Sequence, residues 1–153
     1  MPFLVITIDK LRFAPYRAAS DLYLQRLRHY QVTQERELKP ARGKHSDEQV
    51  RQLESDAILA AHVGPGPLVV LDERGDGVGS LALAQRLDQW CQRGQAVSFA
   101  VGGALGHAGS LRERADWLWS LSPLTLPHEL ARVLLYEQLY RAMTILRGEP
   151  YHK

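Results

Sequence analysis

The chain holds a glycine-rich segment at residues 102–110, GGALGHAGS, that could bind a ligand against its backbone. Gly102, Gly103 and Gly106 let backbone N–H groups approach a ligand without interference from a Cβ atom. The segment lacks the GxxxxGK[ST] spacing of a phosphate loop, and no GxGxxG opens a helix after a strand. These absences argue against an NTPase and an ordinary dinucleotide enzyme. Turn geometry alone remains the alternative explanation for the glycines.

The other reactive side chains match no common catalytic or metal motif. The six histidines include no HxxxH pair, and the lone cysteine, Cys91, excludes a CxxC, so we predict no metal site. No GxSxG pattern marks a nucleophile elbow. Asp72 follows an apolar run and could contact a ligand hydroxyl, although a turn-forming role is the more common one. The residues alone therefore favour a ligand-binding domain without naming the ligand.

Apolar runs of strand length alternate with stretches of helical period along the chain. This alternation predicts one α/β domain over residues 1–153, with a mostly parallel sheet flanked by helices. The expected strands are residues 3–8, 32–38, 68–71, 97–101 and 117–121, and the expected helices are 14–30, 111–116, 127–148 and those beginning near Ser46 and Ser80. Ligands of such sheets bind beyond the carboxyl ends of the strands, which are followed here by loops 72–80, 102–110 and 122–127.

The last helix carries two adjacent apolar stripes, where one is enough to face a sheet. Their members are Val133, Tyr136, Tyr140 and Met143 in one stripe and Leu135, Leu139, Ala142 and Leu146 in the other. Such a helix lies either deep in the core or against a partner subunit. We favour a symmetric homodimer, which leaves no large apolar patch in water.

Composition and charge exclude several classes of protein. With 153 residues, 45% of them hydrophobic and 24% charged, the chain is typical of globular domains and not of disordered ones. Its apolar runs of about six residues are too short to span a bilayer, no leader is expected, and a single cysteine favours the reducing cytoplasm. Residues 1–45 hold nine basic and four acidic side chains, which is compatible with a polyanionic partner.

The carboxyl-terminal third resembles one family closely. Its features are SLSPLTLPH at residues 120–128, LARVLLYEQLYRA at 130–142 and PYH at 150–152, preceded by VVLDERG at 69–75 and VGGALG at 101–106. In this order they are similar to the RlmH family of ribosomal RNA large-subunit methyltransferases, within the SPOUT superfamily. The match is strong across residues 68–153 and looser before them.

The resemblance implies a fold, an assembly and a cofactor. The fold is an α/β knot, whose carboxyl-terminal segment threads a deep trefoil, and the molecule is a homodimer that packs through its knotted parts. S-adenosylmethionine lies in the knot. Carried over by position, its pocket comprises Leu71, Gly103, Ser122, Pro123, Leu124, Thr125, Leu126 and Pro127.

The reaction implied is methylation of N3 of a pseudouridine in the intersubunit hairpin of 23S rRNA. The family-matched residues Arg141, Tyr151 and His152 are expected to position the substrate, and the general base stays unassigned. The basic loop residues Lys39, Arg42 and Lys44 are our independent candidates for contact with the RNA backbone. Two alternatives remain: a non-catalytic RNA- or ribosome-binding module with this fold, and an α/β enzyme that acts on a small molecule.

Overall fold

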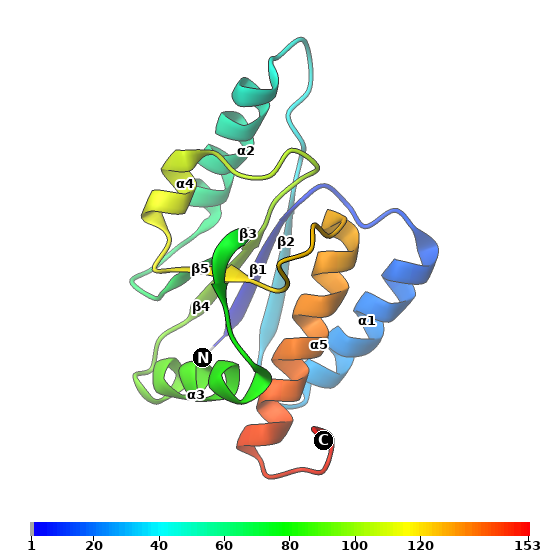
Figure 1. The fold of residues 1–153 in the computed structure, drawn as a ribbon, viewed down its shortest axis with the longest axis vertical. Helices are drawn as coiled ribbons and strands as arrows, with labels where there is room; N and C mark the ends of the chain where they lie inside the picture. The colour runs from blue at the N-terminus through cyan, green and yellow to red at the C-terminus, as the bar shows by residue number, and fades with distance from the viewer. Residues whose placement is uncertain (1) are drawn as a thin grey trace.

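A computed structural model describes residues 2–153 as a five-stranded, entirely parallel sheet flanked by helices (Figure 1). The strands are β1 (Phe3–Ile8), β2 (Thr33–Leu38), β3 (Leu68–Gly77), β4 (Val97–Val101) and β5 (Trp117–Ser120), in the spatial order β2-β1-β4-β3-β5. The helices are α1 (Ala14–Arg28), α2 (Asp47–Ala61), α3 (Ser80–Gln92), α4 (Gly109–Arg114) and α5 (His128–Leu146). The α/β class, the alternation and the parallel sheet are thus as predicted. The knot stays a prediction of the resemblance.

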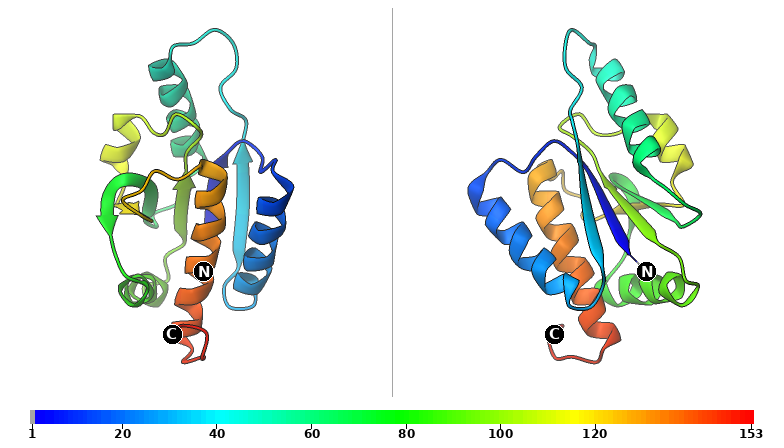
Figure 2. Two further views of the ribbon diagram at one scale, coloured as in Figure 1. Left: turned by 45° about the vertical axis from the view of Figure 1, so that its right-hand side comes forward. Right: turned by 180° about the vertical axis from the view of Figure 1, so that it is seen from behind.

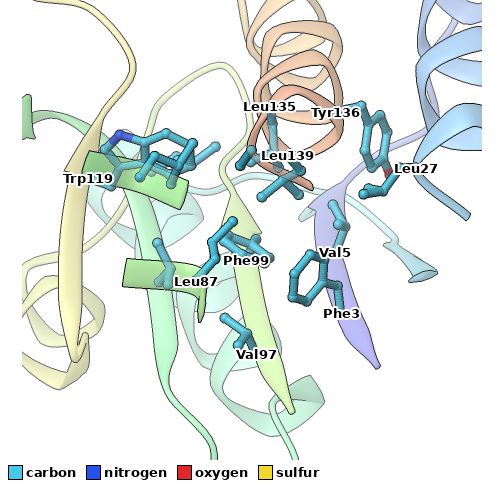
Figure 3. Packing of buried hydrophobic residues seen from close by; sticks show 14 of the residues in the cluster. Phe3, Val5, Leu27, Leu87, Val97, Phe99, Trp119, Leu135, Tyr136 and Leu139 are labelled. Carbon is cyan, nitrogen blue, oxygen red and sulfur yellow. The ribbon is translucent and has the colours of Figure 1, made fainter. Parts of the chain in front are cut away.

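Two helical layers cover the sheet because side chains alternate between its faces along each strand. Phe3, Val5 and Phe99 point toward α1, α3 and α5, where they join one core cluster, whereas Ile6 and Ala100 point toward α2 and α4. Figure 2 shows the sheet between α1 and α5 on one side and α2 and α4 on the other, and Figure 3 shows the first cluster from close by. No helix in the described chain is both long and apolar enough to cross a membrane.

Helix α5 buries most of its two apolar stripes within the chain, except Leu146 at its end, which is 36% exposed, and Tyr140, which is half-buried. It packs between α1 and α3 and over the sheet, so Leu135, Tyr136 and Leu139 are fully buried and Met143 is 7% exposed. Of the two expected positions, deep core is therefore the one that explains the stripes. A homodimer stays a prediction, and it needs support from another part of the molecule.

Strand β3 is longer than the four residues that its apolar run predicts. Both Leu71 and Asp76 pair with Trp119 of β5, so residues 72–75 bulge out of the ladder between them. Gly75 passes close to β5: a Cβ atom there would lie 2.3 Å from the carbonyl oxygen of Leu118. Only glycine allows this crossing, which carries Asp72, Glu73 and Arg74 to the carboxyl end of the sheet.

Candidate active site

A cavity of about 890 Å³ opens at the carboxyl ends of three neighbouring strands. Its walls are residues 71–74 after the apolar part of β3, residues 101–109 after β4, and residues 121–127 after β5, without Pro123. The start of α5, two side chains of α2, Glu48 and Arg51, and Arg112 of α4 complete the lining. The three loops that the sequence singled out thus meet at one place, as the topology of a parallel sheet requires.

The structure brings together seven of the eight residues predicted to hold the cofactor. The residues that line the cavity are Leu71, Gly103, Ser122, Leu124, Thr125, Leu126 and Pro127. Pro123 is exposed and is not part of the lining. Their role toward a cofactor stays a prediction.

Two consecutive glycines let the loop after β4 lie close to its neighbours. A Cβ atom at Gly102 would lie 2.8 Å from Cε1 of the His107 ring. A Cβ atom at Gly103 would lie 2.9 Å from Oε1 of Glu54 and 3.3 Å from Cγ2 of Ile8. A side chain at either position would therefore displace the loop, and at Gly103 it would point toward α2 and β1.

Helix α2 and Arg112 hold this loop by its backbone. Nε of Arg51 donates to the carbonyl oxygen of Leu105 at 3.1 Å, and Oγ of Ser55 accepts from the backbone N–H of Ala108 at 2.9 Å. Nη1 of Arg112 donates to the carbonyl oxygen of His107 at 2.7 Å. The loop is thus held through its backbone by α2 and α4, and two of these side chains, Arg51 and Arg112, also line the cavity.

His107 joins two walls of the cavity. Its Nε2 lies 3.0 Å from the carbonyl oxygen of Leu71, so Nε2 carries the hydrogen and donates it. Burial lowers the pKa of the ring, which is only 4% exposed, and the nearby Arg112 lowers it further against the opposing effects of Asp72 and the Leu71 bond. The ring is accordingly a neutral, rigid spacer between β3 and the loop after β4.

The third wall, residues 121–127, is held by two hydrogen bonds of its side chains. Oγ of Ser122 accepts from the backbone N–H of Leu124 at 3.0 Å, and the Thr125 hydroxyl donates to Glu73 at 2.7 Å. The second bond ties this wall to the bulge of β3. Leu124 is 71% exposed at the mouth of the cavity, where a bound ligand would cover it.

The three predicted positioning residues form a second cluster around Glu137 of α5. Oε1 of Glu137 accepts hydrogen bonds from Nε and Nη2 of Arg141 at 2.9 and 2.5 Å and from the Tyr151 hydroxyl at 3.0 Å. The Arg141 guanidinium lies 4.7 Å from the centre of the Tyr151 ring. Its Nη1 lies 3.2 Å from Nδ1 of His152. The tail is thus folded back onto α5 and ordered by it.

In this arrangement each of the three side chains is a hydrogen-bond donor. Burial and the bond to Glu137 raise the pKa of Tyr151 to about 12, so its hydroxyl stays protonated near neutral pH. Glu137 also raises the pKa of Arg141 above its ordinary value. Because arginine only donates, Nδ1 of His152 must accept from it, which leaves the imidazole hydrogen on Nε2. None of these groups is poised as a base here.

The tail cluster and the cavity lie at opposite ends of α5. His128 at the start of the helix lines the cavity, whereas Arg141 lies thirteen residues further along, about 20 Å at 1.5 Å per residue. Within one chain the residues predicted to position the substrate therefore do not reach the residues predicted to hold the cofactor.

The predicted RNA contacts lie at the same edge of the sheet as the cavity. Lys39, Arg42 and Lys44 are exposed in the loop that joins β2 to α2, above the loop after β4 in Figure 1. The backbone N–H of Ala41 donates to Oε2 of the buried Glu54 at 3.1 Å, which anchors this loop to α2. Their contact with RNA stays a prediction.

Sequence reasoning missed several side chains that build the site. Arg51, His107 and Arg112 gave no signal because their roles depend on the packing of α2 and α4 against the loop after β4. For Glu54, an isolated carboxylate on the inner side of a helix was the available hint. Residues 2–153 contain no group of three or more His, Cys, Asp or Glu side chains placed to hold a metal ion.

A comparison with protein families places the whole chain. The family described as "Predicted SPOUT methyltransferase" matches residues 1–152. The chain belongs to the SPOUT methyltransferase family. It is therefore an enzyme of the methyltransferase class, and the relatives below carry a more specific name.

The chain is similar over its full length to proteins named ribosomal RNA large subunit methyltransferase H. That of Anaeromyxobacter dehalogenans strain 2CP-1 is 44% identical over 156 residues, and that of Deinococcus radiodurans is 43% identical over 150 residues; each alignment covers 97% of both chains. That of Methylobacillus flagellatus is 47% identical over 120 residues, or 76% of both chains. The expected resemblance is confirmed.

Among solved structures, this SPOUT methyltransferase is similar to the SpoU methyltransferase AviRb of Streptomyces viridochromogenes in complex with AdoMet. The TM-score is 0.48 at 16% identity, and the match covers 95% of this chain and 58% of that one.

Proposed function

We propose that this SPOUT methyltransferase transfers a methyl group to N3 of a pseudouridine in the intersubunit hairpin of 23S rRNA. Its membership of the family and its similarity to proteins named ribosomal RNA large subunit methyltransferase H support the class of substrate. The observation that carries the proposal is the cavity, which forms from the bulge of β3 and the loops after β4 and β5 and contains seven of the eight residues expected to hold the methyl donor.

The cavity fits S-adenosylmethionine, the methyl donor of this enzyme class. A volume of about 890 Å³ lies within the range of small-molecule sites, and the lining combines apolar side chains such as Leu71 and Leu126 with backbone groups of the glycine loop. When bound, the cofactor supplies a methyl group on a sulfonium, which is already electrophilic. The protein therefore has to bind and orient the cofactor and to exclude water, and we assign this role to its three loops.

The tail residues suit a pyrimidine whose N3 must lose its proton. In pseudouridine, N3–H lies between two carbonyl groups. Free N–H groups of Arg141 and the Nε2–H of His152 would donate to these carbonyls, orient the base and stabilise the negative charge that develops when N3 releases its proton. Tyr151, whose hydroxyl donates to Glu137, would position Arg141, which lies over its ring. The acceptor of that proton is left unassigned, because Tyr151 is held protonated and His152 presents Nε2–H.

The separation along α5 supports a homodimer with shared sites. About 20 Å of helix divides the tail cluster from the cavity of its own chain, so the tail of one subunit would complete the cavity of the other. We infer that each subunit is a single domain, knotted in its carboxyl-terminal part, and that the dimer acts in the cytoplasm, where ribosomes are found.

The basic loop supports the approach of RNA from the same side. Lys39, Arg42 and Lys44 are exposed in the loop between β2 and α2, at the same edge of the sheet as the cavity, and would neutralise phosphates, which makes binding sensitive to salt. Two copies in a dimer would double this local charge although the net charge of the chain is only +2.

The proposal is tested with ribosomes that lack the modification and with radiolabelled S-adenosylmethionine. We expect one methyl group per large subunit, mapped to N3 of one pseudouridine, and no incorporation when that nucleotide is a uridine. Binding of ribosomes and cofactor without methyl transfer would instead support a non-catalytic module. If the protein binds no ribosomes at any salt concentration, an enzyme that acts on a small molecule would be supported.

A second experiment tests the cavity. Ala104 is exposed and lines the cavity, so Ala104→Trp adds bulk there without disturbing the core. We expect a loss of S-adenosylhomocysteine binding by calorimetry of more than about tenfold. The matched control is Ala60→Trp, at an exposed alanine of α2 outside the cavity lining, which should leave the affinity unchanged. Equal affinity of both variants and the parent would contradict the cavity assignment.

A further inference from the structure

Glu54 is a buried carboxylate without a cation. It lies on the inner face of α2 and is 6% exposed. Its Oε2 accepts one hydrogen bond, from the backbone N–H of Ala41 at 3.1 Å. No lysine, arginine or histidine of residues 2–153 forms an ion pair with it. A buried charge of this kind is costly unless a positive partner compensates for it.

The free oxygen of Glu54 faces the wall of the cavity. Oε1 lies 2.9 Å from the position that a Cβ atom of Gly103 would occupy, and no hydrogen bond to Oε1 is found within the described part of the chain. Gly103 itself lines the cavity. Because Gly103 has no side chain, only backbone separates the carboxylate from the ligand space. The negative charge therefore acts across a thin wall of low polarizability.

The methyl donor and the product that it becomes differ in charge. S-adenosylmethionine carries a sulfonium in addition to its ammonium and carboxylate, whereas S-adenosylhomocysteine has lost the sulfonium charge. A fixed negative charge near the cavity attracts the first more than the second, since the rest of the two molecules is the same. The other acidic groups of the lining, including Glu48, are exposed or are paired with arginine, so solvent and counter-charges weaken their effect.

We propose that Glu54 makes the cavity selective for the charged methyl donor over its neutral product. This inference rests on the proposed cofactor site. It goes beyond that site because a residue outside the lining favours the methyl donor over its product and thereby favours release of the product. Glu54 acts through the field of its carboxylate and does not contact the cofactor.

The test compares two ligands in two variants. Glu54→Gln keeps an oxygen that can accept from Ala41 N–H but removes the charge. The dissociation constants of S-adenosylmethionine and S-adenosylhomocysteine are measured by calorimetry on the full-length protein. We expect the affinity for S-adenosylmethionine to fall by about tenfold, as for charges interacting through partly screened protein, and that for S-adenosylhomocysteine to stay the same. The matched control Asp56→Asn, at an exposed position of the same helix, should change neither constant.

The possible outcomes separate this inference from the cavity assignment. An equal loss for both ligands would show that Glu54 only maintains the loop, and an unchanged ratio would show that its charge is not felt; either result overturns the inference. If Ala104→Trp abolishes binding while the ratio is unchanged in Glu54→Gln, the cofactor site stands and only this inference fails. If Ala104→Trp binds normally, the site itself has been misplaced.

Discussion

At the scale of single residues, the position of the carboxyl-terminal tail depends on Glu137. Its Oε1 receives hydrogen bonds from Arg141 and Tyr151, and Arg141 in turn fixes His152. If these three residues position the pyrimidine, then the carboxylate that orients them is needed for alignment although it does not contact the base. Misalignment of about 1 Å costs roughly a hundredfold in rate when geometry dominates catalysis.

We therefore expect Glu137→Ala to lower the rate constant of methyl transfer by about 10- to 100-fold in single-turnover assays. Cofactor affinity by calorimetry should stay unchanged, because Glu137 is not part of the cavity lining and the tail is expected to position the pyrimidine, not the cofactor. Glu113→Ala, an exposed carboxylate of α4, is the control and should keep the parental rate. A normal rate in Glu137→Ala would show that the folded-back tail does not contribute to catalysis.

His107 allows a prediction about pH. Burial, with the help of Arg112, lowers its pKa in the folded state, whereas Asp72 opposes the shift; in the unfolded chain a histidine titrates near pH 6.5. Between these two pKa values the unfolded state binds more protons, so the free energy of unfolding falls as the pH drops below about 6.5. One such group contributes a slope of at most about 1.4 kcal/mol per pH unit.

The comparison is urea unfolding of the parent and of His107→Leu between pH 7.5 and pH 5. We expect the variant to be less stable at pH 7.5, since it loses the bond to the Leu71 carbonyl, and its stability to depend less on pH over this interval. The same pH slope in both proteins would mean that other groups cause the acid sensitivity.

At the scale of elements, the sequence predicts the strands and helices well because periodicity reports burial directly. The runs 3–8 and 97–101 become β1 and β4, and the helix expected to begin near Ser46 is α2, which Ser46 and Gln49 cap by reciprocal hydrogen bonds. The extension of β3 to Gly77 was missed because it is stabilised by pairing with β5, 43 residues away at both Asp76–Trp119 and Gly77–Ser120, and not by its own polar sequence. The same reason hides His107 and Glu54, whose partners come from other elements.

The edge strand β2 shows a further contact between elements that no local pattern reveals. Glu35 and Glu37 point toward α5, where Arg132 lies only 2% exposed with Nη2 at 2.7 Å from Glu35 and 2.9 Å from Glu37. The Tyr136 hydroxyl also donates to Glu35, at 2.6 Å. This network joins the polar edge of the sheet to the helix whose first residues line the cavity.

We expect Arg132→Leu to lower the free energy of unfolding by about 2–4 kcal/mol, since it leaves the half-buried carboxylate of Glu35 without a counter-charge, whereas Glu37 keeps its ion pair with Arg17. The addition of Glu35→Gln should recover part of that loss, because it removes the uncompensated charge. Both variants are compared with the parent and with Glu35→Gln alone in urea unfolding. Strictly additive effects would contradict the coupling of these two residues.

At the scale of the whole molecule, two half-sites lie in one small chain. The cavity and the basic loop occupy the carboxyl edge of the sheet, and the tail cluster occupies the far end of α5. Within residues 2–153, about 20 Å of α5 separates them. Two chains related by a twofold axis solve this problem, because each then offers its tail to the cavity of the other.

Complementation between two inactive variants tests this arrangement directly. Ala104→Trp should be inactive through its cavity, and Arg141→Ala through its tail, whereas a heterodimer of the two combines one intact cavity with one intact tail. After unfolding and refolding as an equal mixture, half of the dimers are mixed and each has one functional site, so about a quarter of the parental activity should return. Each variant refolded alone should stay inactive. If cavity and tail of the same chain form the site, every site in the mixture carries one defect, and the mixture should be as inactive as its components.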